Sequence, residues 1–178
     1  SLKLANALHS LGYGKGDVIA TYLPNSIQYV IAYYGIVLSG ATYSPINPFN
    51  PASEVAYQIQ DANAVAVIAH ESCAKNLLDD ALKLKDVIVT GTDEIDGING
   101  RTDVHAFSDN WYSLNDLKSR YEARELQVDI DPKEDIAIIS YTGGTTGRAK
   151  GVLSTHYNFV SSCLASSASM GMLPHVDA

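Results

Sequence analysis

The sequence predicts an α/β fold in which a parallel-rich β-sheet is flanked by helices on both faces. Segments with the 3.6-residue apolar period of a helix alternate with short β-rich runs over the first 90 residues. No charged residue occurs from Val18 to Ser53, so most of that stretch must be buried. Alternating strands and helices of this kind are typical of parallel sheets that are covered on both sides.

The first half of the chain supplies four predicted strands and four predicted helices. The segment Ser26–Leu38 is rich in Val, Ile and Tyr, so a strand remains an alternative there. Asn50 is a good helix N-cap, with Pro51 in the first helical position. The predicted strands are Asp17–Leu23, Ala41–Ser44, Val65–Ala69 and Asp86–Thr90, and the predicted helices are Leu2–Leu11, Ser26–Leu38, Asn50–Asn63 and Cys73–Leu84.

The second half begins with a change of pattern. Residues 91–110 are rich in Gly, Asp, Asn and Thr without periodicity, which predicts a surface excursion. A short helix capped by Ser113 follows. The remaining expectations are a buried strand at Asp135–Ser140, a returning strand at Gly151–Thr155 and a helix at Tyr157–Met170.

Length, charge and composition exclude several classes of function. The 178 residues are enough for one domain with a real core. A net charge of −8 argues against a nucleic-acid partner, which would require a basic surface. The most hydrophobic stretch, Tyr29–Leu38, is far shorter than the roughly 20 residues of a membrane span. We therefore expect no integral membrane segment and a cytoplasmic location.

Cysteine and histidine usage adds no chemistry of its own. Cys73 and Cys163 are isolated, which predicts buried or half-buried thiols in a reducing compartment. The five histidines lie at no ligand spacing, so we expect no structural metal site. His156 has no Ser, Cys or carboxylate partner nearby, and we expect it to close a turn or pack under a loop.

The most informative stretch is Ser140–Gly151, which gathers glycines, threonines and one lysine directly after a predicted strand. Glycine lets a ligand approach backbone N–H groups, threonine hydroxyls donate to phosphate oxygens, and lysine adds a compact positive charge. Lys150 follows Ala149 and precedes Gly151, so the stretch is not a Walker A loop. A plain Gly/Thr hairpin loop is the alternative, and Arg148 is then expected to be solvated.

The run from Tyr141 to Val152 closely resembles the phosphate-binding signature of the adenylate-forming superfamily, which includes acyl-CoA synthetases, aryl-CoA ligases, luciferases and amino-acid adenylation domains. The Gly-Gly-Thr-Thr-Gly form is most similar to fatty acyl-CoA ligases. Gly143 replaces a common Ser and Ala149 a common Pro, and the missing proline should loosen the loop. Further similar segments are Gly16–Ala20, Leu23–Ser26, Gly40–Ala41, Pro45–Pro48, Glu54–Ile59 and Leu153–Asn158.

The resemblance implies an ATP-dependent carboxylate–CoA ligase, which forms an acyl-adenylate and then a thioester with coenzyme A. A 4-coumarate-type or amino-acid-adenylating relative, or a stand-alone nucleotide- or phosphate-binding module, remains open. Residues 1–178 would be an N-terminal α/β subdomain, without a catalytic residue and inactive alone, whose partners are the small molecules carboxylic acid, ATP and CoA. A homodimer or other self-association through the truncated face is also expected. The implied ATP-binding residues are Thr142, Gly143, Gly144, Thr145, Thr146, Gly147 and Lys150, with Thr145 and Thr146 helping to place Mg²⁺.

Overall fold

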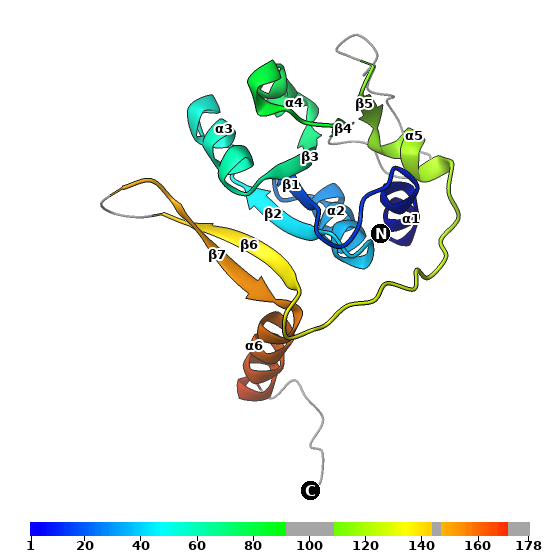
Figure 1. Ribbon diagram of the computed structural model, residues 1–178, viewed down its shortest axis with the longest axis vertical. Coiled ribbons are helices and arrows are strands. Elements are labelled where there is room, and N and C mark those ends of the chain that lie inside the picture. The colour runs from blue at the N-terminus through cyan, green and yellow to red at the C-terminus, as the bar shows by residue number, and fades with distance from the viewer. Residues whose placement is uncertain (92–108, 144–146, 171–178) are drawn as a thin grey trace, which may run out of the picture.

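A computed structural model describes residues 1–91, 109–143 and 147–170 of the chain. Within these residues, seven strands form one sheet in the order β5-β4-β3-β1-β2-β6-β7 (Figure 1). All neighbouring strands are parallel except β6 and β7, which are antiparallel. The strands are β1 (Val18–Tyr22), β2 (Thr42–Ile46), β3 (Ala64–His70), β4 (Asp86–Thr90), β5 (Trp111–Ser113), β6 (Ile136–Thr142) and β7 (Lys150–Thr155).

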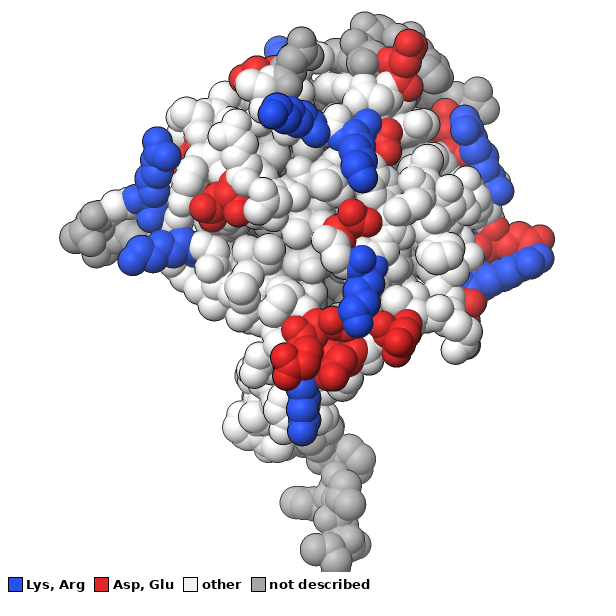
Figure 2. All heavy atoms as spheres, in the orientation of Figure 1, with Lys and Arg blue, Asp and Glu red and all other residues white. Residues whose placement is uncertain are grey.

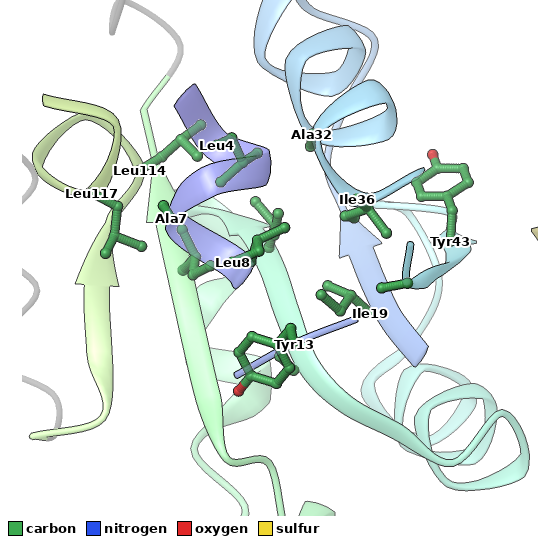
Figure 3. Close-up of a cluster of buried hydrophobic side chains, with 14 of the residues drawn as sticks. Leu4, Ala7, Leu8, Tyr13, Ile19, Ala32, Ile36, Tyr43, Leu114 and Leu117 are labelled. Atoms are coloured by element: carbon green, nitrogen blue, oxygen red, sulfur yellow. The ribbon is translucent and has the colours of Figure 1, made fainter. Parts of the chain in front are cut away.

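One face of the sheet is covered by α1 (Leu2–Ser10), α2 (Ile27–Leu38) and α5 (Leu114–Ser119). The close-up in Figure 3 shows their side chains meeting over the strands, with Leu4 and Leu8 from α1 beside Ile36 from α2. The strands contribute alternate residues to this cluster, because successive side chains of a strand point to opposite faces. The buried strand residues on this side include Ile19, Tyr43, Ala66, Ile68, Ile88 and Ile138.

The opposite face is covered by α3 (Ala52–Asp61), α4 (Glu71–Ala74) and two short 3₁₀ turns, Lys75–Leu77 and Asp80–Leu82. Here the strands turn their other set of residues inward. Both faces of β1 to β4 are therefore buried, whereas β7 is mostly exposed, and the predicted fold class is confirmed. The core on this side includes Ala20, Tyr22, Val55, Ile59, Val67, Ala69, Leu77, Leu82, Val87 and Val89.

The ambiguous segment after β1 is a helix. Ser26 adopts an extended conformation and its hydroxyl accepts a hydrogen bond from the Tyr29 N–H, which caps α2. Gly35 lets α2 lie close to α1, because a methyl group there would come within 2.6 Å of the Leu4 side chain. Tertiary packing thus overrides the β-propensity of the segment. The uncharged run is mostly buried, although Ile27, Val30, Tyr34 and Leu38 form an exposed stripe on α2.

Three local expectations were wrong. Pro51, not Asn50, occupies the cap position of α3, with ψ at 152° and no side-chain cap. The expected helix over Cys73–Leu84 breaks into α4 and the two 3₁₀ turns, because the Asp79 carboxylate accepts from the Ala81 N–H and Lys83 takes a positive φ of 51°. Strand β5 was not predicted, since three residues carry too little periodicity.

The outcome differs among the remaining expectations. Ser113 caps α5 as predicted, accepting from the Asp116 N–H. Of the expected surface excursion, residues 92–108 lie outside the described residues. Cys73 is half-buried but Cys163 is exposed on α6 (His156–Ser169), where a buried or half-buried thiol was expected. Among the described helices, none has the length and apolar character that crossing a bilayer requires.

A strap of residues 120–135 runs from α5 around α1 to the start of β6 (Figure 1). The Asn6 amide donates to the Arg124 carbonyl at 2.7 Å, and the Lys15 ammonium lies 2.7 Å from the Asp135 carboxylate. Gly40, with a φ of +86°, has no side chain that would block Val128 of the strap. These contacts fix where β6 begins, and therefore where the glycine-rich stretch emerges from the sheet.

Candidate functional site

The glycine-rich stretch forms the connection of a β-hairpin at the edge of the sheet. Strand β6 ends at Thr142 and β7 begins at Lys150, and these two residues are paired in the antiparallel ladder. In Figure 1 the hairpin extends well beyond the helices that cover the main sheet. The Gly/Thr hairpin that was the alternative interpretation of this stretch is therefore present. Its two strands carry the candidate phosphate-binding loop.

The described part of the loop is open to solvent. Thr142, Gly143, Gly147 and Lys150 are exposed, and a methyl group at either glycine would meet no atom within 4 Å. Within the described residues, no carboxylate lies within ion-pair distance of the Lys150 ammonium. Gly144, Thr145 and Thr146 lie outside the described residues. The structure therefore brings together Thr142, Gly143, Gly147 and Lys150 at one end of the hairpin.

A hollow of about 360 Å³ lies between this loop and the segment that leads from β2 into α3. Its walls are mostly polar, with amides from the β2–α3 segment on one side and the loop on the other. Parallel strands such as β2 place ligands at their carboxyl ends, and this hollow adjoins the carboxyl ends of β2 and β6. The lining residues are Pro45, Asn47, Asn50, Glu54, Gln58, Tyr141, Thr142, Gly143, Gly147, Arg148 and Ala149.

Helix α3 contacts the hairpin through one stripe of side chains. The Tyr141 hydroxyl donates to the Asp61 carboxylate at 2.8 Å, and the Tyr57 hydroxyl donates to the Ala149 carbonyl at 3.1 Å. The two tyrosine rings meet edge to face, with centroids 6.4 Å apart. Burial, and then the nearby Asp61 carboxylate, raise the pKa of Tyr141, so its hydroxyl remains a neutral donor.

Arg148 and His156 take structural positions. The Arg148 guanidinium is exposed, as expected, but it also stacks over the Tyr57 ring, 4.9 Å from the ring centroid. His156 is the first residue of α6, and its N–H donates to the Asp135 carbonyl at 3.3 Å. Thr155 caps the same helix in a reciprocal capping box with Asn158. This hydrogen bond at the turn between β7 and α6 is made by the main chain of His156, so it does not test the role expected of the side chain.

Comparison with known protein families gives the class of protein. The sequence pattern of the AMP-binding enzyme family matches residues 1–176. The chain therefore belongs to the AMP-binding enzyme family, and the resemblance to adenylate-forming enzymes is confirmed.

The curated relatives include CoA ligases of more than one substrate class. The chain is 34% identical over 174 residues to a long-chain-fatty-acid–CoA ligase of Bacillus subtilis, a match that covers 90% of this chain and 31% of the relative. It is 33% identical over 162 residues to 4-coumarate-CoA ligase 1 of Narcissus pseudonarcissus, covering 91% of this chain and 27% of that protein. The chain thus spans about a third of the length of the curated relatives it matches.

Solved structures give the same result for the fold. A long-chain-fatty-acid-CoA ligase from Archaeoglobus fulgidus superposes with a TM-score of 0.79 at 30% identity, covering 98% of this chain and 32% of the other. The ATP-bound MatB protein from Rhodopseudomonas palustris superposes with a TM-score of 0.76 at 26% identity, covering 94% of this chain and 30% of the other.

Sequence reasoning missed the part of the site that α3 supplies. Glu54, Tyr57, Gln58 and Asp61 lie at positions i, i+3, i+4 and i+7, so they share one face of the helix. Val55 and Ile59 mark the opposite, buried face. The spacing was readable from the sequence, but nothing in it indicated that this polar face would meet the hairpin.

Proposed function

We propose that this chain forms the triphosphate-binding part of an ATP-dependent carboxylate–CoA ligase. The observation that carries the proposal is the exposed Lys150 at the end of the hairpin loop, together with Thr142, Gly143 and Gly147 around the polar hollow. The family membership supports it, as does the ATP-bound state of one structural neighbour.

The residues present suit a polyphosphate. Gly143 and Gly147 leave space for phosphate oxygens to approach backbone N–H groups, and the exposed Lys150 ammonium, which forms no ion pair among the described residues, can supply the counter-charge. The Thr142 hydroxyl adds a donor at the mouth of the hollow. Gly144, Thr145 and Thr146 complete the proposed set, with Thr145 and Thr146 assisting a Mg²⁺ ion that accompanies the nucleotide.

The proposed reaction belongs to the whole ligase. A carboxylate oxygen attacks the α-phosphorus of ATP, the bond to pyrophosphate breaks, and the thiol of coenzyme A then displaces AMP from the acyl-adenylate. In this scheme the chain's own residues bind and orient the β- and γ-phosphates and offset their charge as pyrophosphate leaves. We favour a fatty acid as the carboxylate, because of the Gly-Gly-Thr-Thr-Gly form and the fatty-acid ligase relative, with a 4-coumarate-type acid as the alternative.

The first test is binding of Mg·ATP to the 178-residue chain by calorimetry. We expect measurable affinity that falls roughly tenfold or more in Lys150→Ala, since a charge-assisted contact is lost. Lys3→Ala on α1 is the matched control, because it removes the same charge from an exposed position in another element. Equal affinity of the Lys150→Ala and wild-type chains, or no affinity in the wild type, would contradict the proposal.

A second test separates binding from turnover. We propose that the chain alone does not catalyse the reaction, because it spans only about a third of the length of the CoA ligases that it matches. ATP–pyrophosphate exchange with a fatty acid, measured on the purified chain, should therefore stay at background. Exchange above background that is lost in Lys150→Ala would show that these residues suffice for adenylation.

We also propose that the protein is cytoplasmic and that it has no nucleic-acid partner, in keeping with its net charge of −8.

A further proposal is that the chain associates with a second copy through the apolar side of β7 and α6. From residue 151 to 170 the chain carries no Asp, Glu, Lys or Arg, although its net charge is −8. Figure 2 shows a mostly uncharged surface where α6 projects, with a group of acidic side chains and a basic one at its base. Two such surfaces can meet without like-charge repulsion. The exposed apolar residues there are Val152, Leu153, Tyr157, Phe159, Val160, Leu164 and Met170.

Sedimentation at increasing concentration tests this contact. The wild-type chain should form dimers, and Leu164→Glu should remain monomeric because a carboxylate would be buried in the contact. Leu78→Glu is the control, since Leu78 is similarly exposed but lies outside α6. A monomeric wild type, or a dimer that survives Leu164→Glu, would contradict the proposal.

A further inference from the structure

We propose that Tyr57 of α3 is a positioning residue for the phosphate loop, which holds the backbone just before Lys150. Its hydroxyl donates to the carbonyl of Ala149, 3.1 Å away. The inference rests on the proposed function, because the position of Lys150 matters only if the loop binds a ligand. It goes beyond that function by assigning a role to a residue on another element.

The contact lies where the loop has least support from the ladder. Thr142 and Lys150 are the last pair of the hairpin, so Gly143 and residues 147–149 have no strand partner among the described residues. Ala149 immediately precedes that pair. A hydrogen bond to its carbonyl therefore extends the ordered part of β7 by one residue into the loop and limits the directions in which the Lys150 side chain can leave the backbone.

A second contact from the same ring acts one residue earlier. The Arg148 guanidinium stacks over Tyr57, with 4.9 Å between its central carbon and the ring centroid. The ring thus holds the backbone of Ala149 by its hydroxyl and the side chain of Arg148 by its face. While Arg148 lies on Tyr57, the exposed Lys150 forms no ion pair with the described residues.

Tyr57 is itself held by a rigid neighbour. Its ring meets Tyr141 edge to face, and the Tyr141 hydroxyl is bonded to Asp61 on the same helix. Tyr141 lies opposite Gly151, where a methyl group would come within 3.4 Å of the Tyr141 ring and 3.1 Å of Ile139. The two tyrosines therefore connect α3 to both strands of the hairpin. This restraint replaces the one that a proline at 149 would give, because proline limits the loop through φ whereas Tyr57 limits it through a hydrogen bond.

The test compares Tyr57→Phe with Tyr34→Phe in the 178-residue chain. Tyr57→Phe removes only the hydroxyl that reaches Ala149 and keeps the ring under Arg148. Tyr34→Phe makes the same change at an exposed tyrosine on α2. Two quantities are measured for each variant: the exchange rates of the backbone amides of residues 147–151 without nucleotide, and the dissociation constant for Mg·ATP.

Tyr57→Phe should accelerate exchange at residues 147–151 by roughly two- to tenfold and weaken Mg·ATP binding by a similar factor, as expected for one lost hydrogen bond. The amides of α1 and the thermal midpoint should stay at their wild-type values, which a general structural role for Tyr57 would not allow. Tyr34→Phe should change neither quantity.

Unchanged loop exchange in Tyr57→Phe overturns the inference, and so does acceleration spread evenly over the chain. If the wild type binds Mg·ATP and loses it in Lys150→Ala while Tyr57→Phe binds normally, the proposed function stands and the positioning role fails. If the wild type binds no Mg·ATP, the proposed function fails, and the exchange rates alone decide whether Tyr57 holds the loop.

Discussion

Replacing Gly35 with alanine should destabilise the chain, because α2 lies against α1 at this position. The added carbon would lie 2.6 Å from Leu4 Cδ2, 2.8 Å from Cγ and 3.0 Å from Cβ. Rotation of the Leu4 side chain cannot move its Cβ, so the helices themselves must separate. Overpacking of this kind costs about 1–3 kcal/mol, and three short contacts place it in the upper half of that range. The better helix propensity of alanine offsets roughly 1 kcal/mol.

A net loss of about 1–2 kcal/mol is therefore expected, measured as a lower urea midpoint at an unchanged slope. The companion variant is Leu4→Ala, which removes all but the Cβ of the side chain that Gly35→Ala would meet and alone costs roughly 2–5 kcal/mol. In the Leu4→Ala background, Gly35→Ala should cost less or become stabilising, because the new methyl group fills vacated space. The reasoning is refuted if Gly35→Ala is neutral in the wild type or costs the same in both backgrounds.

Two further predictions concern the strap. Gly40→Ala should be more destabilising than Gly12→Ala in urea unfolding. Both glycines have φ near +87°, but only the Gly40 methyl group would meet Val128, at 2.5 Å. Equal losses of stability would show that the strap moves away from the new methyl group. The hydrogen bond from Lys15 holds the pKa of Asp135 below its ordinary value, so the pair stabilises the fold above the ordinary carboxyl range and the effect is lost as pH falls through the folded pKa. Lys15→Met should therefore lower the thermal midpoint near neutral pH, and the difference should shrink as the pH falls below the ordinary carboxyl range. A difference that stays constant in acid would rule out the ion pair as its cause.

The elements that periodicity predicted best are those whose local signals agree with their packing. The predicted helix Leu2–Leu11 forms α1, whose periodic apolar residues Leu4, Ala7 and Leu8 are buried, and Asp86–Thr90 forms the strand that its β-rich composition indicates. The segment from Cys73 to Leu84 fails because its apolar spacing is helical while Asp79 and Lys83 favour turns. The spacing of apolar residues takes no account of polar residues, and in this segment the polar residues determine the backbone conformation.

The candidate site divides in the same way. The loop could be found from the sequence, because the chemistry of phosphate binding is local and Gly143, Gly147 and Lys150 lie within eight residues. The hydrogen bond from Tyr57 of α3 to Ala149 could not be predicted from the sequence, since the two residues are 92 positions apart and meet only in the folded chain. The scarcity of charged residues after Gly151 predicted exposed apolar surface in this part of the chain, but not which residues of α6 would form it.

The attachment of β6 to the sheet has a consequence for how the molecule opens. Strands β6 and β7 pair over six residue positions, but the ladder between β2 and β6 consists of one pair, Tyr43 and Ile138, near Pro45, which has no N–H to donate. We therefore expect the hairpin with α6 to unfold more readily than β1 to β4, once its side-chain hydrogen bonds to α3 and β2 are broken. A ligand held at Lys150 would stabilise that unit alone, so nucleotide should raise its local opening free energy without changing that of the remaining sheet.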